Sequence, residues 1–305
     1  MLRNGGYDRF DGYEALRKIN LLLKSKGANL PITTEGLVMA IRGGVDGEGK
    51  RAIELLLQQK GDELLRLTEE AVTALAQNGW RKVIEIIFKR LGGKVPITEG
   101  VMAAATGNEY DAGVMEVLLE QKGVELLVTE RVVTAAAGNG SGAKELMELL
   151  FKKKGDKLPI TERVVTAAAG NEGIYSAEVM ELLFKEKGDK LPITERVVTA
   201  AAGNESGAKD LMELLFEEKG DKLPITERVV TAAAGNEGLW SAEVMELLFK
   251  KKGSKLPITE RVVAAVAGNR FRSWQLMEAL LEGRAEGKRN KESEQWTAIL
   301  KASND

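Results

Sequence analysis

The chain of 305 residues contains no cysteine and no histidine. Without cysteine it can form no disulfide bond and has no thiol nucleophile. Without histidine it lacks the commonest general acid–base residue and a frequent metal ligand. An enzyme with this composition would have to depend on Asp, Glu, Lys, Tyr, Ser or Thr alone. We therefore expect a protein that is not an enzyme and that uses no cofactor and no metal.

Long apolar segments are also missing. No run approaches the roughly 18 apolar residues of a membrane-spanning helix. The first residues, MLRNGGYDRF, lack the basic and apolar regions of a signal peptide. The formal net charge of -2 provides no overall field that would attract nucleic acid. We expect a cytoplasmic location, no membrane contact, no nucleic-acid partner, and another protein as the binding partner.

Repetition is the dominant feature of the sequence. Residues 158–190 read LPITERVVTAAAGNEGIYSAEVMELLFKEKGDK, and the pattern returns from Leu191, Leu223 and Leu256, at spacings of 33, 32 and 33 residues. A more divergent copy begins at Leu126. Self-similarity at about 20 to 50 residues is typical of stacked repeat proteins. The pattern predicts an all-α fold, an α–α solenoid of about eight helix–turn–helix repeats of 30–34 residues with terminal caps.

Each copy contains signals for a short first helix. Thr161 is a candidate N-cap, whose hydroxyl could accept a hydrogen bond from a free amide of the first turn. The first helix is predicted over about 162–169, because Gly170 and Asn171 suit a left-handed stop. Isolated helices this short are marginal in water. The helix must therefore bury its apolar face against neighbouring copies.

A second helix follows in each copy. Ser176 can cap a helix over 177–187, whose apolar side includes Met180 and Leu183. Lys187 lies at the negative end of the helix dipole, and Gly188 is predicted to end the helix. The two helices and their connections make up one repeat.

The repeats define the predicted domain limits. Residues 1–29 are predicted as an N-terminal cap helix, 30–283 as the repeat array, and 284–305 as a polar C-terminal cap helix. Open stacks need such caps to cover their last apolar face, and similar repeats could stack end to end if the caps were weak. The apolar side of the C-terminal helix would be formed by Trp296, Ile299 and Leu300.

The repeat pattern resembles a known group of sequences. ITERVVTAAAGN followed by EVMELLF and a closing Gly-Asp is similar to the short ankyrin-like helical repeats of fungal NLR-type receptors, which are heterokaryon-incompatibility-like proteins. The similarity covers about residues 30–283. Leu-Pro-Ile-Thr replaces the opening of a true ankyrin repeat, and the connector from Gly188 to Thr194 is too short for the ankyrin hairpin. The resemblance implies the ligand-sensing part of a longer receptor.

The turn between the two helices is where the copies differ. Short turns such as 205–208 alternate with longer ones such as 172–176, so that Tyr175 corresponds to Trp240, 65 residues later. Equivalent turns of a solenoid line up along one edge, and aromatic residues on loops are typical recognition anchors. An alternative is that each ring only covers the gap between adjacent turns. The candidate binding residues are Trp80, Tyr110, Tyr175, Trp240, Phe271 and Trp274.

Two further motifs have simple structural explanations. Residues 44–51, GVDGEGKR, have the glycine and lysine spacing of a phosphate-binding loop, but Arg51 replaces the magnesium-binding Ser or Thr. The motif occupies the position of the turn between the two helices, where every repeat has glycines. The repeated Glu162–Arg163 pair predicts a ladder of exposed ion pairs between neighbouring repeats. The alternative for the arginines is a row that meets an acidic partner.

The sequence therefore favours a non-enzymatic repeat scaffold for protein–protein recognition. A structural or designed consensus array without a natural ligand is a second hypothesis, and interchangeable turns would support it. An enzyme with its site in the curved groove would need a cluster of acids with raised pKa values. Base-by-base RNA binding would need different polar pairs at one helix position in each repeat, whereas the first helices are nearly uniform.

Overall fold

The computed structural model describes residues 68–79, 81–107, 112–121, 128–140 and 142–282. These residues form helices and turns, and they contain no strand. The predicted cap segments 1–29 and 284–305, the first predicted helix pair and the glycine-rich motif at 44–51 lie outside the described residues. The domain limits thus stay predictions. The chain separates into two compact units, 1–158 and 159–305.

Unit 1 contains three consecutive helix pairs within its described residues. The first helices α4, α6 and α8 pack in series, and the second helices α5, α7 and α9 do the same. Each first helix also packs on the second helix of its own pair. The elements are α4 (Glu69–Gln77), α5 (Arg81–Leu91), η3 (Gly92–Lys94), α6 (Glu99–Ala105), α7 (Gly113–Leu119), α8 (Glu130–Ala137), α9 (Ala143–Lys154) and η5 (Gly155–Lys157).

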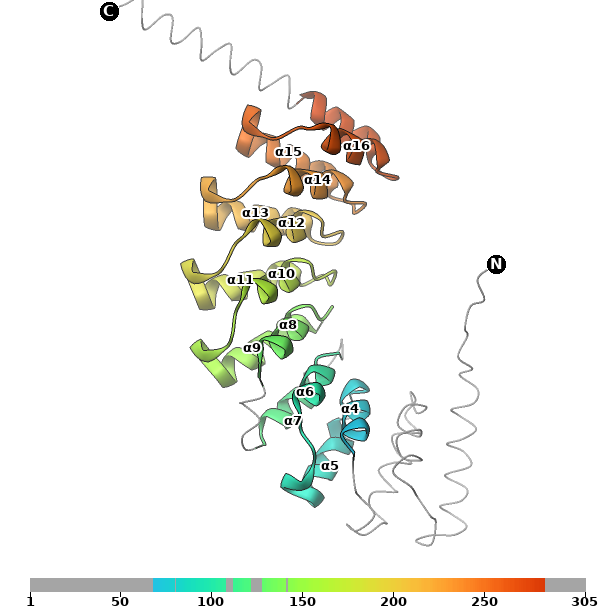
Figure 1. Cartoon of the computed structure of the whole chain (residues 1–305), viewed down its shortest axis with the longest axis vertical. Helices are drawn as coiled ribbons and strands as arrows, with labels where there is room; N and C mark the ends of the chain where they lie inside the picture. Colours follow the sequence, from blue (N-terminus) through green and yellow to red (C-terminus); the bar gives the residue numbers. More distant parts are fainter. Residues whose placement is uncertain (1–67, 80, 108–111, 122–127, 141, 283–305) are drawn as a thin grey trace, which may run out of the picture. The chain divides into compact units, whose positions relative to one another are not determined.

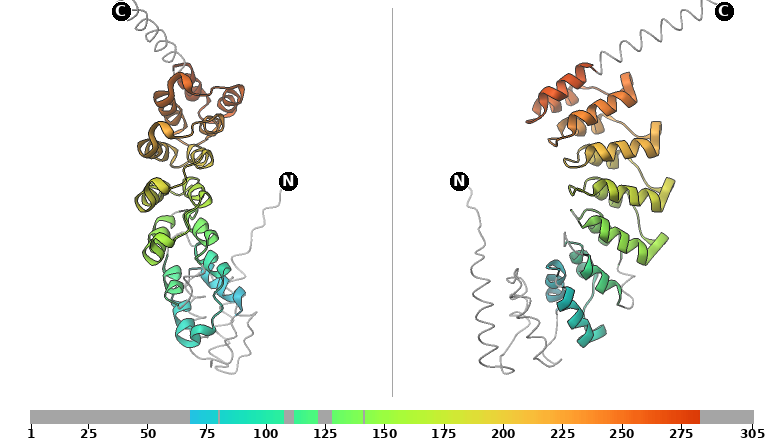
Figure 2. Two further views of the ribbon diagram at one scale, coloured as in Figure 1. Left: turned by 60° about the vertical axis from the view of Figure 1, so that its left-hand side comes forward. Right: turned by 180° about the vertical axis from the view of Figure 1, so that it is seen from behind.

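Unit 2 repeats this arrangement in two rows of helices. The first helices α10, α12, α14 and α16 lie side by side, and α11, α13 and α15 form the second row (Figure 1). Figure 2 shows the two rows of this unit nearly end-on in its left view. The predicted α–α solenoid is confirmed. The elements are α10 (Glu162–Ala169), α11 (Ser176–Lys187), η6 (Gly188–Lys190), α12 (Glu195–Ala202), α13 (Ala208–Lys219), η7 (Gly220–Lys222), α14 (Glu227–Gly235), α15 (Ser241–Lys252), η8 (Gly253–Lys255), α16 (Glu260–Gly268) and the helical residues 273–282.

The core runs between the two rows. In α12, Val197 and Val198 are fully buried, and α13 contributes Leu211 and Leu215. Burying an apolar side chain of this size stabilises the fold by about 1.5–3 kcal/mol. An eight-residue helix such as α12 is too short to be stable alone. Contacts with the neighbouring pairs therefore provide most of its stability.

The first helices begin at the predicted residue but use its hydroxyl differently. Thr68 and Thr98 accept hydrogen bonds from the amides of Ala71 and Val101, at 3.3 and 3.2 Å, as a capping residue should. Thr161 and Thr194 occupy the N-cap position without such a bond. The predicted capping hydrogen bond is therefore wrong for these two threonines.

The glycine that needs a left-handed backbone lies at the other end of the repeat. Gly170 follows α10 with φ -90°, so the predicted left-handed stop at this position is wrong. Gly188 directly follows α11, so the predicted end of this helix is confirmed, and its backbone has φ 52° and ψ -131°. Its carbonyl accepts a hydrogen bond from the Leu191 amide at 3.1 Å, which closes the short 3-10 turn. Side-chain-bearing residues rarely adopt this backbone conformation.

The adjacent glycines of η3 provide a matched test of this backbone requirement. A Cβ at either Gly92 or Gly93 would meet nothing within 4 Å, but only Gly92 has a positive φ, of 53°. Gly92→Ala is expected to lower the free energy of unfolding by about 1–3 kcal/mol. Gly93→Ala should leave it unchanged or raise it by up to about 1 kcal/mol. Urea denaturation followed by circular dichroism checks both, and equal midpoints would contradict the assignment.

Candidate functional site

A buried asparagine fixes the turn that follows each first helix. In Asn204, Nδ2 donates to the carbonyl oxygens of Ala169 and Asn171 at 3.0 and 2.7 Å, both in the preceding repeat. Oδ1 accepts from the amides of Ser206 and Gly207 at 3.0 and 2.7 Å. One side chain thus shapes its own turn and ties it to the turn before.

The same pattern recurs along unit 2, and we call it the asparagine ladder. Asn236 Nδ2 donates to Ala202 and Asn204 at 3.0 and 2.9 Å. Asn269 Nδ2 donates to Ala234 and Asn236 at 3.2 and 2.8 Å. In unit 1, Asn139 donates to the Thr106 carbonyl and accepts from the Gly142 amide. The buried ladder residues are Asn139, Asn171, Asn204, Asn236 and Asn269.

The two long turns present apolar side chains to solvent. Tyr175 and Trp240 occupy the N-cap positions of α11 and α15, with φ near -105° in both. Each follows an exposed aliphatic residue, Ile174 or Leu239. The turns after α10 and α14 lie on the same side of unit 2 (Figure 1). The exposed fractions are 74% for Ile174, 38% for Tyr175, 66% for Leu239 and 42% for Trp240.

The long and short turns of unit 2 pack closely against each other. A Cβ on Gly238 would lie 2.1 Å from the backbone oxygen of Glu205, in the preceding short turn. A Cβ on Gly207 would lie 2.5 Å from Oγ of Ser176, at the start of the preceding second helix. Lys209 Nζ lies 5.1 Å from the centre of the Trp240 ring. The turn that carries Leu239 and Trp240 therefore rests on the repeat before it.

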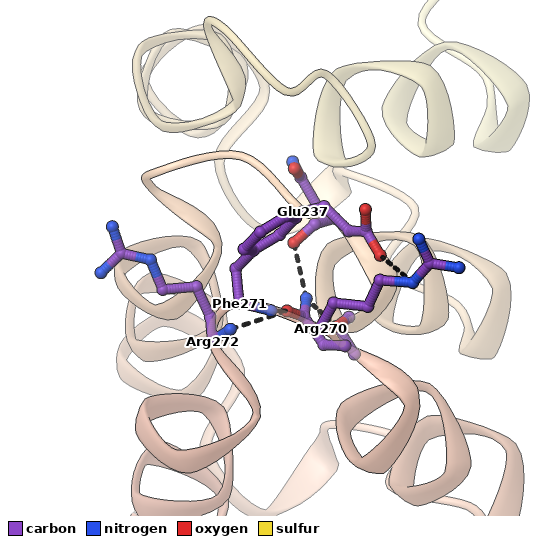
Figure 3. A network of polar contacts seen from close by, with 7 residues as sticks. Glu237, Arg270, Phe271 and Arg272 are labelled. Carbon is purple, nitrogen blue, oxygen red and sulfur yellow. Dashed lines mark hydrogen bonds and ion pairs between the residues drawn. The ribbon is translucent and has the colours of Figure 1, made fainter.

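The last described turn departs from the others in sequence and charge. Arg270 replaces the glutamate that follows the ladder asparagine in the other turns of unit 2, and its Nε lies 3.9 Å from Glu237 Oε1. Figure 3 shows Arg270 directed toward Glu237, with Arg272 on the opposite side of Phe271. Phe271 and Trp274 are 69% and 76% exposed.

Four of the six predicted binding residues can thus be placed. Tyr175, Trp240, Phe271 and Trp274 are all exposed in or beside the turns of unit 2. Trp80 and Tyr110 lie outside the described residues. The turns also expose two aliphatic side chains, Ile174 and Leu239, which were not among the predicted residues. We define the turn edge by the residues Ile174, Tyr175, Leu239, Trp240, Phe271 and Trp274.

The main partner of the repeated glutamates is a threonine hydroxyl, which donates a hydrogen bond to the carboxylate, and not an arginine. The carboxylate of Glu162 accepts from the Thr194 hydroxyl of the next repeat at 2.7 Å. Equivalent hydrogen bonds join Thr98 to Glu69, Thr129 to Glu99, Thr226 to Glu195 and Thr259 to Glu227.

The arginines at the next position take part far less. Arg131 lies 3.8 Å from Glu99, which is a long ion pair between exposed groups. Arg196, Arg228 and Arg261 are exposed and form no ion pair with any described residue. The predicted glutamate–arginine ladder is therefore wrong for these three arginines, whereas the bond from threonine to glutamate recurs along the repeats.

Within the described ranges, no three Asp or Glu side chains are grouped so that they could hold a metal ion. None of the helices described is long and apolar enough to cross a membrane.

Comparison with protein families assigns the repeat. A family model described as a domain of unknown function, DUF7104, matches residues 55–82, 87–115, 117–147, 149–180, 182–212, 214–245 and 247–277. These seven consecutive matches together cover more than half of the chain. The chain belongs to the DUF7104 family. No curated protein and no solved structure matches the chain.

The DUF7104 unit is offset from the helix pair. The match 149–180 begins within α9 and ends within α11, so that it spans a connector, one first helix and one turn. The match 182–212 runs in the same way from α11 to α13. Each of these two DUF7104 matches therefore contains one residue of the asparagine ladder, Asn171 or Asn204.

Proposed function

We propose that this DUF7104 array is a non-enzymatic scaffold that recognises another protein through its turn edge. The observation that carries the proposal is the exposure of bulky apolar side chains on turns that are held by buried hydrogen bonds. Large apolar side chains that are exposed together often mark sites of interaction with another protein. Tyr and Trp are also frequent among the residues that dominate binding energy.

The rigidity of these turns supports the proposal. Trp240 lies two residues after Gly238, which packs against the Glu205 backbone. Oδ1 of Asn236 accepts a hydrogen bond from the Gly238 amide at 2.7 Å. A side chain held in this way loses little conformational freedom when a partner binds. Binding is therefore stronger than it would be for the same ring on a loose loop.

We infer the role in the cell from the resemblance described above. The similarity to repeats of fungal NLR-type receptors supports a role as the sensing region of such a receptor, in the cytoplasm. The absence of histidine and cysteine from the sequence supports a role in binding rather than catalysis. Recognition would combine apolar contacts at the turn edge with shape-matched docking on the adjacent helices.

Binding assays on paired variants test this function. The edge variant replaces Ile174, Tyr175, Leu239 and Trp240 with serine. The edge variant and the parent are each used to capture proteins from an extract of cells that express the parent, and the two sets of captured proteins are compared. Losing buried anchors of this kind weakens an interface by at least about 2 kcal/mol, or roughly thirtyfold. We expect the edge variant to lose a partner that the parent retains.

The matched control changes charged residues on the second helices instead. Glu181, Glu213 and Glu246 are exposed on α11, α13 and α15, and all three become alanine. This control should retain the partner, and both variants should melt like the parent. Equal retention by the edge variant and the parent would contradict recognition at the turn edge. If the parent captured no specific protein, a structural array without a ligand would be favoured.

A further inference from the structure

Helix α16 is the final member of the row of first helices described in unit 2. It exposes positions that are buried in α14, the preceding member of this row. Val230 and Ala234 of α14 are fully buried, and α14 packs against α16. Their equivalents 33 residues later are Val263, which is 40% exposed, and Ala267, which is also exposed. A groove runs along this side of α16, lined by Ile258, Thr259, Glu260, Val263, Ala264 and Ala267. We call this side the α16 groove.

The glycine at the end of each first helix shows what the groove lacks. A Cβ on Gly170 would lie 3.7 Å from the Ala200 Cβ of the next first helix, and the corresponding distance from Gly203 to Ala232 is 3.8 Å. For Gly235 and Ala265 the distance is 4.0 Å. A Cβ on Gly268, at the end of α16, would meet nothing within 4 Å. The surface that receives a neighbouring helix in each earlier repeat of unit 2 is thus open at α16.

We propose that residues 292–302 of the same chain cover the α16 groove. This segment, ESEQWTAILKA, has Trp296, Ile299 and Leu300 at the spacing of one apolar helix face. The described part of the chain ends at Glu282, so that only the nine residues 283–291 separate it from this segment. Such a linker can extend to about 30 Å, whereas packed helices lie only about 8–10 Å apart.

The tether favours this segment over a second copy of the protein. A segment joined to its binding surface by a short linker has an effective concentration on the order of millimolar. A second molecule would instead lose translational and rotational freedom on docking. The proposal concerns the end of the array and does not depend on recognition at the turn edge.

Chemical cross-linking tests the proposal, because the natural chain contains no cysteine. The test protein contains Ala267→Cys in the groove and Leu300→Cys in the segment, and a short bismaleimide joins cysteines that lie close together. The control pairs Leu300→Cys with Glu246→Cys, an exposed position on α15. We expect the cross-linked monomer to form on the order of tenfold faster in the test protein than in the control, since docking raises the local concentration.

Three outcomes would overturn the proposal. Equal rates in the two proteins would show that the segment does not dock in the groove. Cross-linked dimers in place of monomers would assign the groove to a second copy. A rate unchanged by adding Trp296→Ser to the test protein would exclude docking through the apolar side of the segment. Thermal melting of all three proteins checks that the repeats themselves stay folded.

Discussion

Replacing Asn204 by alanine is expected to lower the free energy of unfolding by about 3 kcal/mol, because buried polar groups would lose their partners. The side chain bonds to the carbonyls of Ala169 and Asn171 and to the amides of Ser206 and Gly207. Because Asn204 is almost fully buried, water cannot readily replace these bonds. Denaturation in urea, followed by circular dichroism on the whole chain, measures the change.

The control for this variant lies two residues away. Ser206 is exposed in the same turn, and its backbone amide rather than its side chain bonds to Asn204. Ser206→Ala should therefore change the free energy of unfolding by no more than about 0.5 kcal/mol. If Asn204→Ala and Ser206→Ala unfolded at the same urea concentration, the asparagine ladder would have no role in stability.

Gly238→Ala is expected to cost about 2–3 kcal/mol, through steric overlap rather than lost hydrogen bonds. The added Cβ would lie 2.1 Å from the Glu205 carbonyl oxygen and 2.7 Å from its carbonyl carbon and Cα. These are backbone atoms, so the overlap cannot be relieved by a change of rotamer. The turn must shift instead, and Leu239 and Trp240 must shift with it. Urea denaturation measures the loss, and partner capture should fall in the same variant.

Gly235 provides the comparison for this substitution. It lies three residues earlier, and its nearest neighbour for an added Cβ is the Ala265 Cβ at 4.0 Å, an ordinary contact distance. Gly235→Ala should leave stability unchanged or improve it by up to about 1 kcal/mol, since it is the last residue of α14. Similar losses in both variants would show that the turns of unit 2 do not pack as described.

Much of the fold could be predicted from local sequence signals. The helix predicted over 162–169 agrees with α10, and the helix predicted over 177–187 differs from α11 only in its first residue. Capping residues, apolar spacing and Gly188 act within a few positions of one another, so a single copy of the repeat is enough to read them. The serial packing of helices followed from the repeat period.

The contacts between repeats could not be read in this way. Thr194 has the local pattern of an N-cap, but its hydroxyl bonds to Glu162, 32 residues earlier. Asn171 has the local pattern of a helix stop, but the equivalent Asn204 bonds to the backbone of the preceding turn. Local rules assign each side chain to its nearest backbone group, whereas stacking brings a distant one closer. The recurrence of asparagine after each first helix was the signal that could have indicated a shared role.

The candidate site was predicted in part. The alternation of turns draws attention to Tyr175 and Trp240, and both side chains are exposed. Their role in binding stays a prediction. The exposure of Ile174 and Leu239 was not expected, because an aliphatic residue in a repeat is usually assigned to the core. Ile174 and Leu239 directly precede the N-cap residues of α11 and α15, so they lie in the turns between helices and outside the buried rows of helices.

The close packing of unlike turns also bears on how such an array can change in length. Gly207 leaves room for Ser176, and Gly238 leaves room for the Glu205 backbone, so each kind of turn supplies its glycine at a different position. A single inserted repeat would place two turns of the same kind next to each other and remove this fit. Recombination in this part of the gene would therefore preserve the packing when it adds or deletes two repeats together, the 65 residues that separate Tyr175 from Trp240. The array would then grow or shrink by two repeats at a time, although each repeat is a single pair of helices.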